Sequence, residues 1–173
     1  MHSRSIVLAL AVAVFSLPVT AQAAEPSAAL IQRADKIAAV LGLSDSTQAL
    51  RVRDLIASQY RDLSLVHDAR DAALKAAKET PGNGATAESA KDTATARMAD
   101  LHYAYVAALS VELTPDQVEQ VKDGMTYGVV PLTFRVYQEM LPDLSAEQKR
   151  RILGWLREAR EHAMDAGSSD EKH

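Results

Sequence analysis

Apolar residues recur every three or four positions through most of the chain, which is the spacing of amphipathic helices. The first stripe predicts a helix from Ser27 to Leu41, with Gly42 as its C-terminal stop. The second predicts a long helix that opens at Leu43-Ser44-Asp45 and runs to Glu79. Thr80-Pro81-Gly82-Asn83-Gly84 combines a proline with two glycines, so we expect the chain to turn there.

Helical spacing resumes at about Glu88, and further helices are expected from Thr114, from about Leu132 to Met140, and from Ser145 to about Gly167. No stretch alternates between apolar and polar residues as a half-buried strand does. The sequence therefore predicts an all-α fold, an antiparallel bundle of five or six helices with a hairpin around Pro81-Gly82.

One segment departs from this pattern. Gly124, Gly128 and Pro131 lie close together, although glycine and proline cost a helix interior roughly 1 and 3 kcal/mol relative to alanine. We predict a helix kinked by glycine and proline near residues 124–131. Two compatible explanations remain open: a close helix–helix crossing, or a bend that exposes Asp123 and Tyr127 beside Arg135 and Tyr137.

A short motif, Leu-Ser/Thr-x-x-Gln, occurs at Leu113–Gln117 and Leu144–Gln148, and with one extra residue at Leu43–Gln48. The hydroxyl and the glutamine can form a capping box, so three helix starts explain the motif. The motif also resembles the LTxxQ periplasmic chaperones, which are small secreted helical proteins.

Residues 1–23 have the pattern of a signal peptide: a basic start, an apolar run too short to span a bilayer, and Ala21-Gln22-Ala23 before the cleavage point. We therefore expect a periplasmic or secreted protein with one helical domain over residues 24–167 and a polar tail over residues 168–173. After signal cleavage we expect no membrane association.

Composition narrows the function. The 173 residues include no cysteine, which excludes thiol catalysis and cysteine-based metal sites. The formal net charge of −4, without a basic run, argues against nucleic acid as a partner. No glycine-rich phosphate loop or hydrolase signature is present, and we expect no cofactor.

Three histidines have neighbours that suit a ligand or a catalyst. Glu158, His162 and Asp165 fall on one face of the last predicted helix and could hold a metal or polarise a water. A solvated helix face explains them better, so no metal site is predicted. His67 lies in a similar weak cluster, and His102 fits a partly buried, hydrogen-bonded position.

Two segments, Gln120–Gly128 and Ala159–His173, resemble a family of secreted helical bacterial proteins catalogued as a domain of unknown function. That family carries a sugar-binding label, and its genes often lie in polysaccharide-utilization loci. The resemblance implies a carbohydrate partner. In the family an aromatic and basic stretch follows the Gly-Ser-Ser segment, so we expect a C-terminus shorter than the family's.

The leading hypothesis is a carbohydrate-binding protein of polysaccharide utilization. Its expected ligand-binding residues are Asp123, Tyr127, Arg135, His162 and Asp165. One alternative is a lyase or hydrolase of acidic glycans, with His162 or Tyr127 as base and Arg135 steadying a uronate carboxylate. The other is a chaperone or interaction module, which would expose an apolar concave face.

Overall fold

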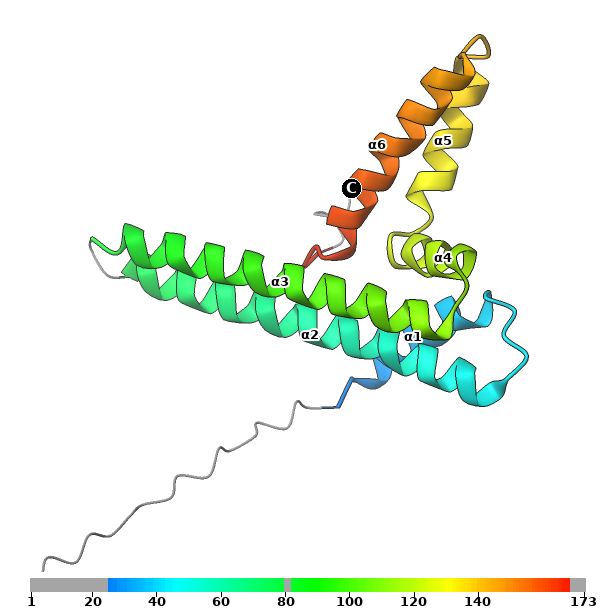
Figure 1. Ribbon diagram of the computed structural model, residues 1–173. Helices are drawn as coiled ribbons and strands as arrows, with labels where there is room; N and C mark the ends of the chain where they lie inside the picture. Colours follow the sequence, from blue (N-terminus) through cyan, green and yellow to red (C-terminus); the bar gives the residue numbers. More distant parts are fainter. Residues whose placement is uncertain (1–24, 80–81, 169–173) are drawn as a thin grey trace, which may run out of the picture.

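The computed structural model describes residues 25–79 and 82–168, and this part of the chain is entirely helical (Figure 1). It contains α1 (Ala28–Ala39), α2 (Ser46–Glu79), α3 (Gly84–Glu112), α4 (Pro115–Met125), α5 (Val129–Met140) and α6 (Ala146–Met164). The predicted all-α fold is confirmed. The predicted signal peptide, residues 1–23, and most of the predicted polar tail lie outside the described residues.

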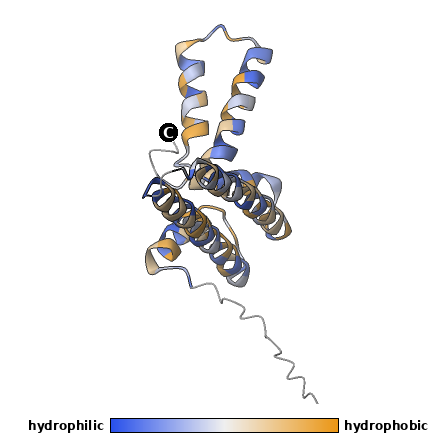
Figure 2. Cartoon of the chain, turned by 90° about the vertical axis from the view of Figure 1, so that its left-hand side faces the viewer, coloured by the Kyte–Doolittle hydropathy of each residue, from blue (hydrophilic) through white to orange (hydrophobic). Residues whose placement is uncertain are grey.

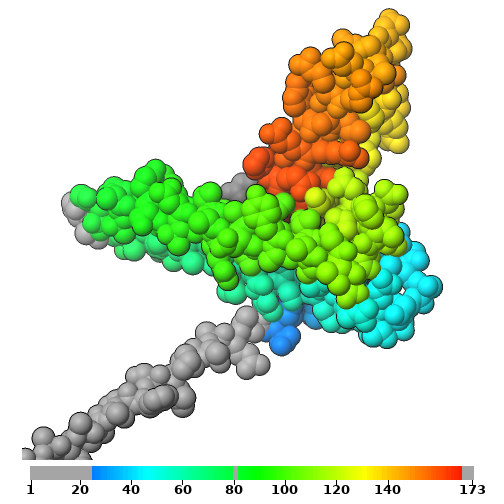
Figure 3. Space-filling model, viewed as in Figure 1, coloured from blue at the N-terminus to red at the C-terminus, as the bar shows by residue number. Residues whose placement is uncertain are grey.

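Two helical hairpins meet at α4. Helices α2 and α3 form a long antiparallel pair, and α1 packs on α2. Helices α5 and α6 form a second pair that projects away from the first, and Figure 3 shows the C-terminal end of α6 seated between α3 and α4. The short helix α4 contacts α1, α3, α5 and α6, so it joins the two hairpins.

Local capping explains where α4 and α6 begin. The Thr114 hydroxyl accepts from the Gln117 N–H, and the Gln117 side chain accepts from the Thr114 N–H at 3.1 Å. Ser145 and Gln148 make the same reciprocal pair. The third copy of the motif differs, because Asp45 caps α2 by accepting from the Thr47 N–H at 2.8 Å.

The predicted kink is a complete break between α4 and α5. Helix α4 ends at Met125, and α5 starts at Val129, three residues before the predicted Leu132. Pro131 therefore lies inside the first turn of α5. The backbone N–H groups of a first turn have no partner within the helix, so proline is tolerated there.

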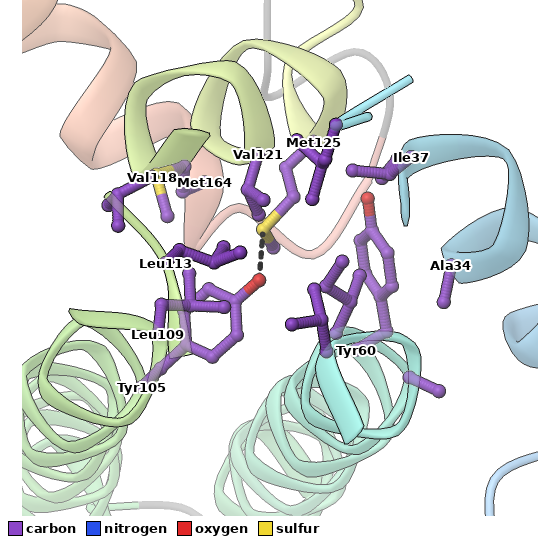
Figure 4. Close-up of a cluster of buried hydrophobic side chains, with 14 residues drawn as sticks. Ala34, Ile37, Tyr60, Tyr105, Leu109, Leu113, Val118, Val121, Met125 and Met164 are labelled. Atoms are coloured by element: carbon purple, nitrogen blue, oxygen red, sulfur yellow. Dashed lines mark hydrogen bonds between the residues drawn. The ribbon is translucent and has the colours of Figure 1, made fainter. Parts of the chain in front are cut away.

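The core lies where α1, α2, α3, α4 and α6 meet (Figure 4). Val52, Ile56, Leu109, Val121 and Met125 are fully buried within it. The Tyr105 hydroxyl lies 3.2 Å from the Met125 sulfur, which links α3 to α4.

Gly124 marks a close crossing of α4 and α1. A Cβ added at Gly124 would lie 3.0 Å from Ile37 Cγ2, which is tighter than ordinary van der Waals contact. The first of the two explanations for the glycine pair is thus correct for Gly124.

The α5–α6 hairpin, which we call the arm, stands largely outside this core. Within the described residues of α5, only Val130 is buried. Several apolar side chains of the arm are exposed, including Leu132 (51%), Met140 (72%) and Trp155 (59%), and Figure 2 shows its mixed hydropathy. None of the described helices is long and apolar enough to cross a membrane.

Candidate functional site

The turn between α4 and α5 holds Tyr127 in a strained backbone conformation. Its φ of +57° is the only positive value at a non-glycine residue in the described part of the chain. A left-handed backbone costs an ordinary L-residue roughly 1–2 kcal/mol. Gly128, which follows with φ +67°, accepts this conformation readily. Because such strain concentrates at functional positions, the turn is the starting point for a site.

Arg33 of α1 fixes the Tyr127 ring. Its Nη2 donates a hydrogen bond of 2.7 Å to the Tyr127 hydroxyl. The guanidinium carbon lies 5.1 Å from the centroid of the Tyr127 ring and 4.6 Å from that of Tyr60. Both distances fall within the range of cation–π attraction. The arginine therefore connects two tyrosines that come from different segments of the chain.

These three side chains line a pocket of about 180 Å³. The lining also includes the apolar Leu30 and Leu63, the hydroxyl-bearing Ser64, and the segment from Ala166 to Ser168 that follows α6. Four separate parts of the chain thus form the pocket: α1, α2, the α4–α5 turn and the segment that follows α6.

His67 lies against that closing segment. It is 7% exposed, and its Nε2 lies 2.7 Å from the Asp165 carbonyl oxygen. A carbonyl oxygen only accepts, so Nε2 carries the proton of this hydrogen bond. Nδ1 is buried without a hydrogen-bond partner in the described part of the chain. A Cβ on Gly167 would meet the imidazole at 2.8 Å, so only glycine fits there.

Tyr60 keeps its phenolic proton at neutral pH. Burial raises the pKa of Tyr60 to about 12, although the positive charge of Arg33 acts in the opposite direction. A protonated phenol can donate as well as accept. The pocket therefore combines aromatic faces, hydroxyl groups and one cation.

A buried charge cluster holds α6 against α4 beside this pocket. The Arg160 side chain is 2% exposed and donates to Asp123 and Glu119, each at 2.7 Å, and to Glu161 at 3.2 Å. Burial acts to lower the pKa of Arg160, but the hydrogen bonds to Glu119 and Asp123 outweigh it and the pKa is raised. The guanidinium thus stays charged and ties three carboxylates together.

Two more basic groups complete the cluster. Lys122 Nζ donates to Glu161 at 2.8 Å. Burial acts to raise the pKa of Glu161, but the hydrogen bonds from Lys122 and Arg160 lower it overall. His102 lies 3.0 Å from Asp165 and 3.4 Å from Glu161. Burial raises the pKa of Asp165 despite the neighbouring imidazole. The predicted partly buried position of His102 is confirmed.

The structure brings together only some of the predicted site residues. Tyr127 lines the pocket, while Asp123 and Asp165 belong to the adjoining charge cluster. Arg135 is 66% exposed on α5, where its charged neighbour is Glu139 at 3.8 Å, and His162 is exposed on α6. Neither Arg135 nor His162 lines the pocket, so the expected convergence of all five is not observed.

Sequence reasoning missed Arg33, Tyr60 and His67 as site residues. A signal was present, because Arg33 follows Leu30 by three positions and precedes Ile37 by four, on the flank of the apolar stripe. Tyr60 and His67 are seven residues apart on one face of α2. Such spacing identifies a shared face, but it cannot show that the faces of α1 and α2 meet at the α4–α5 turn.

A larger hollow lies along the α2–α3 hairpin. This groove of about 560 Å³ is lined mainly by small and apolar side chains such as Leu65, Ala69 and Ala94. Its lining also includes Asp62, which accepts from its neighbour Arg61 at 2.8 Å. The smaller pocket, which places an arginine between two tyrosines, is the better candidate for recognising a polar ligand.

No group of three or more His, Asp or Glu residues in the described ranges is arranged to hold a metal ion. A comparison with curated proteins finds no match to the chain. A family model described as "Protein of unknown function (DUF3826)" matches residues 28–173, which include all six helices and the pocket. The chain therefore belongs to the DUF3826 family of proteins of unknown function.

Proposed function

We propose that this protein binds a saccharide in the pocket formed by Arg33, Tyr60 and Tyr127. The observation that carries the proposal is the strained Tyr127, whose 50% exposed ring lies at a pocket that also contains hydroxyl and cationic donors. A sugar ring presents an apolar C–H face and a rim of hydroxyl groups. Aromatic faces suit the first, and polar side chains suit the second.

The size of the pocket defines the extent of the contact. At about 180 Å³ it is smaller than sites for drug-sized ligands, which span roughly 300–1,000 Å³. It therefore suits one sugar unit or the end of a longer chain. Export to the periplasm, as the predicted signal peptide suggests, would place such a protein where oligosaccharides arrive.

Isothermal titration against a panel of plant and algal oligosaccharides tests the proposal. Tyr127→Ala should weaken binding at least tenfold, which corresponds to about 1.4 kcal/mol. Tyr103→Ala is the matched control, because Tyr103 is 75% exposed on α3 and does not line the pocket. Equal affinities of the two variants, or no binding by the wild type, would contradict the proposal.

A second candidate function is an interaction module, as the LTxxQ-like helix starts suggested. The arm supports it, since Leu132, Val136 and Met140 follow one another at four-residue spacing on α5 and are 40–72% exposed. Isolated exposed apolar residues need no explanation, but a stripe of them fits a partner surface. Suppression of client aggregation by the wild type, lost in Leu132→Ser/Met140→Ser, would favour this candidate.

A further inference from the structure

The charge of the pocket narrows the ligand class, on the assumption that the pocket binds a saccharide at all. Arg33 is the only Asp, Glu, Lys or Arg among the described residues that line it. No carboxylate of the described residues lies within 4.0 Å of its guanidinium. The whole chain is acidic, with a formal net charge of −4, and most arginines in its described part have a carboxylate oxygen within 4.0 Å, which Arg33 lacks among the described residues.

The arginines of α2 show the contrast. Arg51, Arg53, Arg61 and Arg70 each have a carboxylate oxygen within 2.9 Å. Arg33 has two tyrosine rings instead. Cation–π contacts stabilise a guanidinium without neutralising it, and they leave its hydrogen-bonding edge available.

Arg33 is also held in place. The hydrogen bond of 2.7 Å to Tyr127 uses one N–H of Nη2, and the guanidinium carbon lies 4.6 Å and 5.1 Å from the ring centroids of Tyr60 and Tyr127. An arginine has more N–H donors than this phenol can accept, in a planar fork that matches a carboxylate.

We propose that the saccharide bound in this pocket is acidic, and that the carboxylate of a uronate unit pairs with the Arg33 guanidinium. The ligand then supplies a negative charge that none of the described residues places beside Arg33. The tyrosine rings contact the sugar, and the arginine selects the acid over the neutral sugar.

The experiment compares ligands that differ only in charge. Uronate trisaccharides, their methyl esters and the corresponding neutral trisaccharides are titrated by calorimetry into the wild type, Arg33→Gln, Arg33→Lys and Arg151→Gln. Arg151 is the matched control, because it also stacks on an aromatic ring, that of Trp155 at 5.3 Å, but lies on α6 outside the pocket. Thermal unfolding of each variant confirms that it is folded.

We expect the wild type to bind the free acid at least tenfold more tightly than its methyl ester. Arg33→Gln should reduce this ratio to about one, Arg33→Lys should give an intermediate ratio, and Arg151→Gln should keep the wild-type ratio. Equal binding of acid, ester and neutral sugar would overturn the inference while leaving saccharide binding intact. Binding of none of the three series would overturn both.

Discussion

Replacing Arg160 tests whether the buried charge cluster holds the two hairpins together. Arg160→Met keeps most of the side-chain volume but removes the charge. Its side chain is 2% exposed and bonds Asp123 and Glu119 at 2.7 Å each, so the variant leaves partly buried carboxylates without their shared cation. Arg157→Met is the matched control, because Arg157 lies one turn away, contacts the same Glu119 at 3.5 Å and is 55% exposed.

The expected loss of stability depends on which basic partners each carboxylate keeps in the Arg160→Met variant. Breaking a buried ion pair costs roughly 3–5 kcal/mol. Glu161 keeps Lys122 at 2.8 Å, and Glu119 keeps Lys122 at 3.8 Å, whereas Asp123 loses the cation that bonds it. We therefore expect the lower end, about 3 kcal/mol, or about 6–12 °C in Tm for a domain of this size. The exposed Arg157 pair should contribute at most about 1 kcal/mol.

Urea denaturation followed by circular dichroism measures both variants. The free energy of unfolding should fall by about 3 kcal/mol for Arg160→Met and by less than about 1 kcal/mol for Arg157→Met. The Asp123 carbonyl also accepts from the Gly128 N–H at 2.8 Å, so loss of Arg160 should loosen the Tyr127 turn and weaken ligand binding. A difference between the variants of less than about 1 kcal/mol would refute the assignment.

Three further predictions concern single positions. Gly167→Ala should destabilise the fold by roughly 1–3 kcal/mol, because its Cβ would lie 2.8 Å from the His67 ring. Gly154→Ala, inside α6 with open space around it, should stabilise the fold by up to about 1 kcal/mol in the same urea assay. Gly128→Ala should cost about 1–2 kcal/mol, since its φ of +67° disfavours a side chain; no loss would argue against the left-handed turn. The pKa of Glu161 is lowered in the folded state, so its ionised form stabilises the fold at pH values above the usual pKa of 4.5, and this stabilisation is lost as the pH falls through the lowered pKa. Glu161→Gln should therefore flatten the acid arm of a stability–pH profile. An unchanged arm would contradict this prediction.

Local chemistry explains why the helices were predictable. The Thr114 and Ser145 caps, the Gly42 stop and the turn around Gly82 are encoded within a few neighbouring residues each. Helix periodicity likewise needs no tertiary information. The conformation of residues 124–131 was harder to predict from the sequence, because the same glycine and proline pattern is compatible with a bend inside one helix and with a turn between two helices.

The site was harder to predict because its residues come from distant segments. Tyr127 was identified from its glycine neighbours, but its partner Arg33 is 94 positions away. Arg160 could have been recognised as unusual, since it falls four residues from both Leu156 and Met164 on the apolar stripe of α6. A charge in such a position predicts buried counter-ions. It does not say that α4 supplies them.

The unfavourable features of this fold collect in one place, which argues for a function there rather than for stability alone. The left-handed Tyr127 backbone is strained, burial of Arg160 carries a desolvation cost that its carboxylates must offset, and the buried Nδ1 of His67 has no hydrogen-bond partner in the described ranges. All three features border the pocket or the junction behind it, where α4 connects the arm to the body. A protein selected only for a stable helical scaffold has no reason to retain them together, whereas a binding site needs a rigid backbone and fixed polar groups.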